Sequence, residues 1–327
     1  TKILELSGTA FNLIEDYNED EIYTWDYIME QEAKMNWKLN HFGDPNPYEE
    51  LPELKIFTYD LNKLMPGYEA VFDKAFNFRE FFRVWTNDVQ KDGKEMPSTA
   101  KEGQFVYEDD VRKFLDMMCI SNDENNYPFS TEKYRSYFRH SLWMVPGVKE
   151  AKALSKMLHE HPVFGSGQFN IINIAGDGDE EIEYKDALEA VNKGIGPNPE
   201  KTYSITLSCG KLTTGVTVKP WTAVFMLSGS YNTSASTYLQ TIFFFLSPAN
   251  IGGKQKEKCY VFDFAPDRSL KMVASATRLS IKVGTTVDRK ILGKFLNFCP
   301  VISIDGSKMT PYSVESMMGQ LKKSYAE

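Results

Sequence analysis

Short apolar runs alternate with amphipathic segments along the chain, and the alternation becomes regular after about residue 138. Five of these runs predict buried strands, at 140–145, 169–174, 204–207, 223–227 and 259–264. Helical spacing predicts helices between them, at 148–159, near 182–193 and at about 234–246. Strands that alternate with helices are typical of a parallel sheet covered on both faces. The pattern therefore predicts an α/β fold, with ligands outside the carboxyl ends of its strands.

The sections that flank this regular region are harder to interpret. One amphipathic helix is expected over 19–40, with apolar positions three or four apart at Ile22, Trp25, Met29, Ala33 and Trp37. Other elements are expected at the two ends of the chain: a strand at 54–59, a helix at 108–118, and two helices around an apolar stretch at 299–304. The acidic part of the first helix, 19–32, is interpreted as a surface that faces solvent or a partner.

The charge is distributed unevenly, which changes what the net value implies. The chain of 327 residues carries a formal charge of −8, which by itself argues against a nucleic-acid partner. Residues 1–60 hold 14 acidic and 4 basic side chains, whereas the other 267 hold 31 acidic and 33 basic. Because the acidity is local, the rest of the chain is free to present basic side chains to phosphates.

Composition narrows the class of protein further. Apolar residues make up 42% and aromatic residues 13%, which is enough for a packed core and excludes a disordered chain. No run of 18 apolar residues is present to span a bilayer, and no basic-then-apolar leader opens the sequence. The four cysteines are far apart with no CxxC pair, which indicates neither a zinc site nor a disulfide framework. A reduced, cytoplasmic setting without a membrane is therefore expected.

The segment 207–221 is the most informative candidate for a binding site. A predicted strand ends there in a loop that contains Thr213, Thr214 and Gly215, and a second strand follows almost at once. Hydroxyl groups and a glycine backbone at a strand's carboxyl end suit phosphate oxygens, because glycine allows close approach and hydroxyls donate. The same three residues are also typical of a simple turn, so the spacing alone leaves both interpretations open.

At this point the residues resemble a family. Leu212-Thr-Thr-Gly-Val-Thr217, followed by Pro220, looks like motif V of superfamily-two helicases, and is most similar to the motors of restriction enzymes. Ser7, Gly8 and Thr9 end an opening apolar stretch and look like motif III, which links the two motor lobes. The stretch 140–147 falls where motif IV would be. The stretch 236–248, with Gln240, falls where motif VI would be.

The resemblance implies a domain plan and a set of roles. It implies a RecA-like three-layer domain at 134–285, preceded by the end of a first lobe at 1–9 and a helical insertion or linker at 10–133, and followed by a small extension at 286–327. Thr213, Thr214 and Gly215 would contact the nucleic-acid backbone, Gln240 would lie at the nucleotide cleft, and Ser7, Gly8 and Thr9 would couple the lobes. The intact protein would be an ATP- and Mg²⁺-dependent DNA helicase or translocase, with RNA as an alternative partner.

Two departures from the family pattern affect that function. The sequence has no Gly-x-x-x-x-Gly-Lys-Ser/Thr phosphate loop and no Asp-Glu-x-His-type box, which ATP hydrolysis in this class requires. We expect the missing first lobe to supply them upstream, so that this chain alone is inactive and binds neither ATP nor Mg²⁺ strongly. In addition, Phe244 and Ser247 stand where motif VI has its two arginines. Arg268 is a candidate substitute, although an exposed arginine at a helix start is the simpler interpretation.

Two other functions stay open on the sequence. The first is a non-catalytic module that binds nucleic acid or protein, with its phenylalanine run at 243–245 as a protein contact. The second is an unrelated doubly wound α/β enzyme with a small-molecule ligand. Other candidates favour plain structural roles: a solvated turn at 177–181 rather than a cation site, surface positions for His159 and His161, and core positions for Trp143 and Trp221.

Overall fold

The fold is taken from a computed structural model of the chain. The structure describes residues 18, 21–23, 25–68, 76–86, 101–121, 126–176, 184–210, 212, 217–228, 235–276 and 286–326. All statements below concern these residues.

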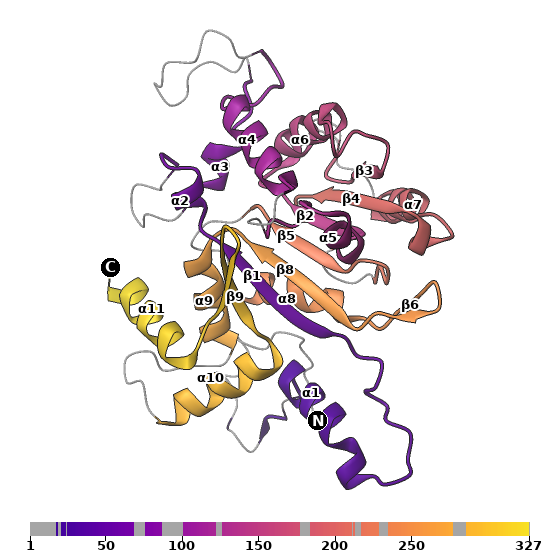
Figure 1. The fold of residues 1–327 in the computed structure, drawn as a ribbon, viewed down its shortest axis with the longest axis vertical. Coiled ribbons are helices and arrows are strands. Elements are labelled where there is room, and N and C mark those ends of the chain that lie inside the picture. Colours follow the sequence, from indigo (N-terminus) through magenta and orange to yellow (C-terminus); the bar gives the residue numbers. More distant parts are fainter. Residues whose placement is uncertain are drawn as a thin grey trace, which may run out of the picture.

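One large sheet forms the centre of the molecule (Figure 1). Its eight strands run in the order β10-β9-β1-β8-β5-β2-β4-β3, and every neighbouring pair is parallel except β9 with β10. The strands are β1 (Glu53–Tyr59), β2 (His140–Met144), β3 (Phe169–Asn173), β4 (Tyr203–Ser208), β5 (Ala223–Met226), β8 (Lys258–Asp263), β9 (Val301–Asp305) and β10 (Lys308–Pro311). A separate small hairpin pairs β6 (Asn250–Ile251) with β7 (Lys254–Gln255).

Helices cover both faces of the sheet, so the fold has three layers. One face packs against α1 (Tyr27–Asn40), α7 (Tyr184–Ile195), α8 (Ala235–Phe243), α9 (Pro266–Ala276), α10 (Thr286–Phe298) and α11 (Val314–Ala326). The other packs against α2 (Leu61–Leu64), α3 (Phe78–Phe81), α4 (Glu108–Cys119), α5 (Glu132–Tyr137) and α6 (Val148–Glu160). The predicted α/β fold with a mainly parallel sheet is therefore confirmed, and its arrangement is RecA-like.

The alternation of side chains along each strand explains why the two faces differ. Trp143, Phe225 and Phe262 point to the face covered by α3, α4 and α6, and the rings of Phe225 and Phe262 stack with centroids 4.6 Å apart. Their neighbours Leu142 and Val224 point to the opposite face, among aliphatic side chains. Since successive residues of a strand face opposite sides, these central strands are apolar throughout and read as continuous runs.

The sheet extends into both flanking segments of the chain. Strand β1 comes from the section interpreted as an insertion, yet it lies between β8 and β9 within the sheet. Strands β9 and β10 come from the section interpreted as an extension. The proposed boundaries at 134 and 285 remain predictions, but both flanks share the central sheet with the residues between them.

Helix α1 differs from the sequence expectation. It begins at Tyr27, and its buried side chains are Tyr27 and Gln31, while Trp25 and Met29 are exposed. Polar bonds account for this orientation: Tyr27 Oη donates to Phe298 O at 2.9 Å and accepts from Leu54 N at 2.9 Å. Hydrogen bonds to the start of β1 and the end of α10 thus fix α1. The spacing of its apolar residues predicted the wrong buried face of the helix.

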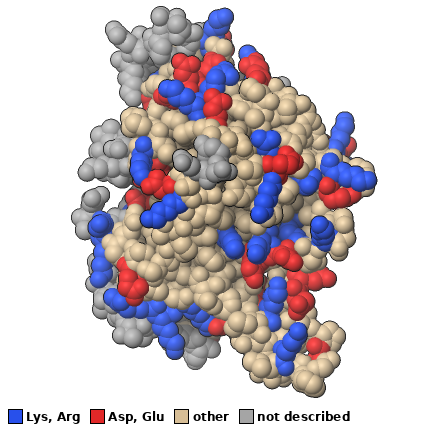
Figure 2. Space-filling model, viewed as in Figure 1, with Lys and Arg blue, Asp and Glu red and all other residues tan. Residues whose placement is uncertain are grey.

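The visible surface carries charges of both signs. Figure 2 shows Lys and Arg interspersed with Asp and Glu on this face, with a blue group low on the left where α10 lies. Such mixing creates no single electrostatic field that would locate a nucleic-acid site. Within the described residues, no helix is both long and apolar enough to cross a membrane.

Candidate nucleic-acid and nucleotide site

The carboxyl edge of the sheet is where the fold places a ligand site. Seven parallel strands end there, and β4, β5 and β8 end at Ser208, Met226 and Asp263. In open parallel sheets, ligands bind outside these ends because loops diverge there and leave backbone groups accessible. The segment that resembles motif V follows β4, and α8, which resembles motif VI, follows β5. Both segments therefore start at the same edge.

Most of the predicted site residues lie outside the described part of the chain. This holds for Thr213, Thr214 and Gly215, for Ser7, Gly8 and Thr9, and also for the acidic turn at 177–181. Their roles stay predictions. The residue just before the Thr-Thr-Gly stretch is described: Leu212 is buried and has a backbone φ of 58°. A left-handed conformation at a leucine is uncommon and indicates a constrained turn at this place.

Gln240 is the one predicted site residue that the structure places. It is half-buried on α8, between the buried Leu239 and Thr241. The phenylalanines that follow pack inward: Phe245 stacks on Trp221 with centroids 5.6 Å apart, and Phe243 stacks on Tyr27 at 5.8 Å. Phe245 is buried and Phe243 is half-buried, and both rings pack against the core.

A buried ion pair fixes the start of α8 at the carboxyl edge. Arg268 donates to Asp263 at 2.6 Å, and Tyr238 Oη on α8 donates to the same carboxylate at 2.8 Å. Arg268 also donates to the carbonyls of Met226 and Ser228 at the end of β5. Asp263 accepts further from Ala265 N at 2.9 Å. One cation and one carboxylate thus connect β5, α8, β8 and α9.

The position of Arg268 corrects the sequence interpretation. It was expected to be an exposed arginine at a helix start, but its side chain is 4% exposed. Burial by itself would lower its pKa, yet the charge and hydrogen bonds of Asp263 raise the pKa above its ordinary value. Burial, followed by the charge of Asp263, raises the pKa of Tyr238, which therefore remains a donor. With these donors committed internally, Arg268 does not fit the role of a substitute motif VI arginine.

A second buried cation fixes the opposite end of α8. Lys256 is 5% exposed, and its Nζ donates to three backbone carbonyls: Lys219 at 3.0 Å, Trp221 at 3.3 Å and Phe245 at 3.0 Å. Cys259 Sγ donates to the carbonyl of Phe245 as well, at 2.9 Å. Burial lowers the pKa of Lys256. These contacts lie at the amino edge, since Trp221 precedes β5 and Lys256 precedes β8.

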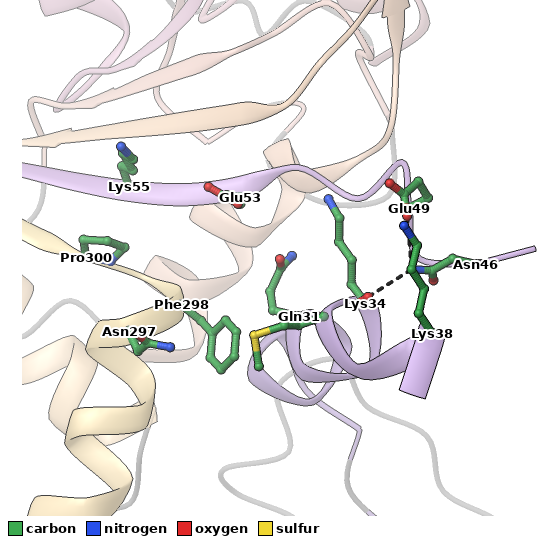
Figure 3. Close-up of a pocket in the computed structure, with 11 residues that line it drawn as sticks. Gln31, Lys34, Lys38, Asn46, Glu49, Glu53, Lys55, Asn297, Phe298 and Pro300 are labelled. Carbon is green, nitrogen blue, oxygen red and sulfur yellow. Dashed lines mark hydrogen bonds between the residues drawn. The ribbon is translucent and has the colours of Figure 1, made fainter. Parts of the chain in front are cut away.

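A surface groove lies away from the carboxyl edge. It has a volume of about 410 Å³ and lies between α1, the start of β1 and the end of α10 (Figure 3). Lys34 on its wall donates to Leu51 O at 2.8 Å, and its own carbonyl accepts from Asn46 Nδ2 at 3.0 Å. Glu49 and Glu53 also line the groove, so its charge is mixed. Gln240, the predicted site residue that the structure describes, does not line this groove.

Two histidines have internal roles that linear spacing did not reveal. His161 was expected at the surface without a carboxylate partner, but it is buried and its Nε2 lies 3.1 Å from Asp116 Oδ1. Its Nδ1 accepts from Val163 N at 3.1 Å, which places the proton on Nε2. His140 is buried between Ser204 Oγ and Pro199 O, each at 2.8 Å. Asp116 and His161 are 45 residues apart in the sequence, so no short-range pattern could predict that they form a pair.

Other predictions about side chains are settled by burial. Trp143 and Trp221 are core residues, as expected, and are not available to stack on bases. Among the described residues, no group of three or more His, Cys, Asp or Glu side chains is arranged to hold a metal ion.

Comparisons with known proteins support the restriction-associated resemblance. No family model matches the chain. A curated protein of Mycoplasma pneumoniae, named "Putative type II restriction enzyme and methyltransferase RM.MpnORF110P C-terminus", is 31% identical over 288 residues. That alignment covers 82% of this chain but only 38% of the relative, so the chain spans about two fifths of the relative's length.

Two solved structures align with the chain at low similarity. The DNA-bound ATP-dependent Type ISP restriction-modification enzyme LlaBIII aligns with a TM-score of 0.41 and 13% identity, over 85% of this chain and 17% of that one. Dbp5 of S. cerevisiae, bound to RNA and ADP BeF3, aligns with a TM-score of 0.34 and 10% identity, over 92% of this chain and 53% of that one.

The fold and its edge define a RecA-like α/β domain. The chain resembles the second RecA-like half of superfamily-two helicases and is similar to restriction-modification proteins, as its motifs predicted.

Proposed function

We propose that this chain is the C-terminal motor lobe of an ATP-dependent DNA helicase or translocase that belongs to a restriction system. The observation that supports this most is topological. The motif V-like segment joins β4 to β5, and the motif VI-like helix α8 joins β5 to β8. Two consecutive crossovers thus bring the proposed DNA segment and the proposed nucleotide segment to one carboxyl edge. Similarity to a restriction enzyme and methyltransferase supports the proposed setting.

The proposed roles follow the sequence motifs. Thr213, Thr214 and Gly215 hold the DNA backbone, because hydroxyls and a glycine backbone approach phosphate oxygens closely. Gln240 contacts the nucleotide from α8. Ser7, Gly8 and Thr9 couple the two lobes. RNA in place of DNA is an outcome of the same binding test.

The chain's own residues fit only part of an ATP site. Bound ATP and Mg²⁺ supply a transferable phosphoryl group whose charge must be neutralised by lysines, arginines and the metal. The sequence offers no phosphate loop, Phe244 and Ser247 occupy the motif VI arginine positions, and Arg268 is engaged with Asp263. We therefore infer that the intact protein's other lobe holds the phosphates and Mg²⁺, and that this chain alone does not hydrolyse ATP. The reduced cytoplasm remains the proposed compartment.

A non-catalytic binding module is the second candidate function. The missing phosphate loop and motif VI arginines favour it. The proposed phenylalanine contact does not, because Phe243 and Phe245 pack against Tyr27 and Trp221 inside the molecule. The motor-lobe function is therefore preferred.

DNA binding by a double variant of the loop tests the proposal. Thr214→Ala with Gly215→Ala should weaken the affinity for a labelled DNA duplex roughly tenfold and reduce its dependence on salt, because phosphates are no longer held there. Fluorescence anisotropy across a salt titration gives both quantities. The matched control is Thr310→Ala with Gly319→Ala, since Thr310 is exposed and a Cβ at Gly319 meets no atom within 4 Å. Equal binding by both double variants and the unchanged chain would remove the loop from the site.

A further inference from the structure

Lys256 connects the motif V-like segment, which is proposed to bind DNA, with the motif VI-like segment, which is proposed to contact the nucleotide. Two of the three carbonyls that it binds, those of Lys219 and Trp221, belong to the crossover from β4 to β5. The third, that of Phe245, belongs to the crossover from β5 to β8. The side chain itself comes from the end of this β5-to-β8 crossover, between β7 and β8. A single ammonium group thus connects two crossovers that share no strand ladder at this point.

The chemistry of this contact demands a lysine rather than a space-filling side chain. An ammonium group has three N–H donors, and here they meet three carbonyl acceptors. Among the described residues, no carboxylate lies within ion-pair distance of Lys256, so backbone dipoles alone compensate the buried charge. Burying an ammonium without a counter-ion is costly, and an apolar residue would fill the volume at lower cost. The charge is therefore present for the three bonds that it makes.

A second donor strengthens the same junction. The carbonyl of Phe245, which ends the motif VI-like segment, also accepts from Cys259 Sγ at 2.9 Å. The Phe245 ring stacks on the Trp221 ring, so the two crossovers touch through side chains as well as through Lys256. Lys256 N in turn donates to Ala249 O at 2.8 Å, which fixes the segment that carries the lysine.

We infer that Lys256 is a positioning residue that couples the DNA-binding loop to the nucleotide-contacting helix. It holds the amino-edge ends of the two crossovers in one arrangement, while their carboxyl-edge ends begin at Leu212 and at the first turn of α8. A displacement of either crossover then requires the other to move or the three bonds to break. The assignment of the two segments to DNA and nucleotide rests on the proposed function, whereas the clamp itself does not.

Hydrogen exchange tests the clamp without any ligand. Lys256→Met keeps the length of the side chain and removes all three donors. Amide exchange of 217–222 and of 243–249 should rise roughly tenfold beyond any change in β9, because both crossovers open locally. The matched control is His161→Gln, which also perturbs a buried side chain with three hydrogen-bond contacts but on the other face of the sheet. A rise in only one of the two segments, or a uniform rise, would overturn the inference.

DNA affinity tests the positioning role. At a temperature where both variants are folded, Lys256→Met should bind a labelled DNA duplex about fivefold more weakly at fixed salt, and His161→Gln should bind as the unchanged chain does. Local opening with unchanged DNA affinity would refute positioning. If the unchanged chain binds no DNA, the proposed function fails, and the exchange result still decides the clamp. If Lys256→Met does not fold, Lys256→Gln, which removes the charge and keeps only two N–H donors on a shorter side chain, is measured against the same criteria.

Discussion

Two buried cations of different kinds lie near the two ends of the segment formed by α8 and the short turn Phe244–Leu246 that follows it. At the carboxyl edge, Arg268 meets a full counter-charge on Asp263, which also accepts from Tyr238. At the amino edge, Lys256 meets only the carbonyls of Lys219, Trp221 and Phe245. The charge of Asp263 raises the pKa of Arg268, so the guanidinium stays charged. Burial lowers the pKa of Lys256. The same segment is thus tied down by an ion pair at one end and by backbone dipoles at the other.

Loss of the ion pair and loss of the lysine contacts would affect the fold in different ways. The ion pair involves two side chains on the β8–α9 turn, and its loss would leave a charge stranded in the core. The lysine clamp leaves neutral carbonyls behind when it is lost, and these can regain partners by small local shifts. We therefore expect the carboxyl-edge anchor to contribute mainly to global stability, and the amino-edge anchor mainly to the relative placement of two crossovers.

The largest effect is expected when the ion pair is broken on one side. Arg268→Met leaves Asp263 ionised and buried, which should lower the free energy of unfolding by about 3–5 kcal/mol. Urea denaturation followed by far-ultraviolet circular dichroism measures this. Adding Asp263→Asn should recover part of the loss, because the stranded charge is removed. A single variant that loses less than about 1 kcal/mol would show that the pair is not the anchor described here.

A smaller effect is expected at the amino edge. Lys256→Met removes three hydrogen bonds but also removes the desolvation cost of a charge, so the unfolding free energy should fall by about 2 kcal/mol. The same urea titration measures it, and Lys34→Met, at a partly exposed lysine of the groove, is the control that should change little. A loss as large as that of Arg268→Met would abolish the distinction between the two anchors.

The smallest effect is expected for His140, a buried imidazole at the amino edge of the sheet that stays unprotonated. Burial lowers the pKa of His140 to about 4, so the folded state stays neutral where the unfolded state takes up a proton. Stability therefore falls as the pH drops from about 6.5 towards 4, and the loss between pH 7 and pH 5.5 should be about 1 kcal/mol. Thermal unfolding of the unchanged chain and of His140→Gln at both pH values measures the difference. An equal pH dependence in both proteins would contradict this assignment.

The sequence was informative where the signal is local. The strands of the regular region and the core positions of Trp143 and Trp221 could be predicted, because apolar runs and their spacing report burial directly. The face of α1 could not be predicted from the spacing of its apolar residues, because Tyr27 accepts a hydrogen bond from Leu54 N and Gln31 donates to Pro52 O.

The Arg268–Asp263 ion pair and the contacts of Lys256 could not be predicted for a different reason. Arg268 and Asp263 are only five positions apart, but Arg268 is also held by the carbonyls of Met226 and Ser228, which are 42 and 40 residues away in sequence. Lys256 carries no motif, and its three acceptors are backbone atoms that every residue possesses. The candidate site was predicted from the chemistry of the 213–215 loop and from family motifs, and of its residues the structure describes only Gln240. The rest of that site remains a prediction from the sequence.

The antiparallel β10 has a consequence for how the molecule meets other molecules. It adds a short, exposed strand to the end of a parallel sheet, and it contains Lys308 and Pro311. Proline lacks the N–H that an incoming strand would need, and a charged side chain disfavours stacking of edges. The last strand therefore blunts this edge, so that sheet extension by a neighbouring chain is discouraged there, and the long row of buried strands behind it is protected from edge-to-edge aggregation.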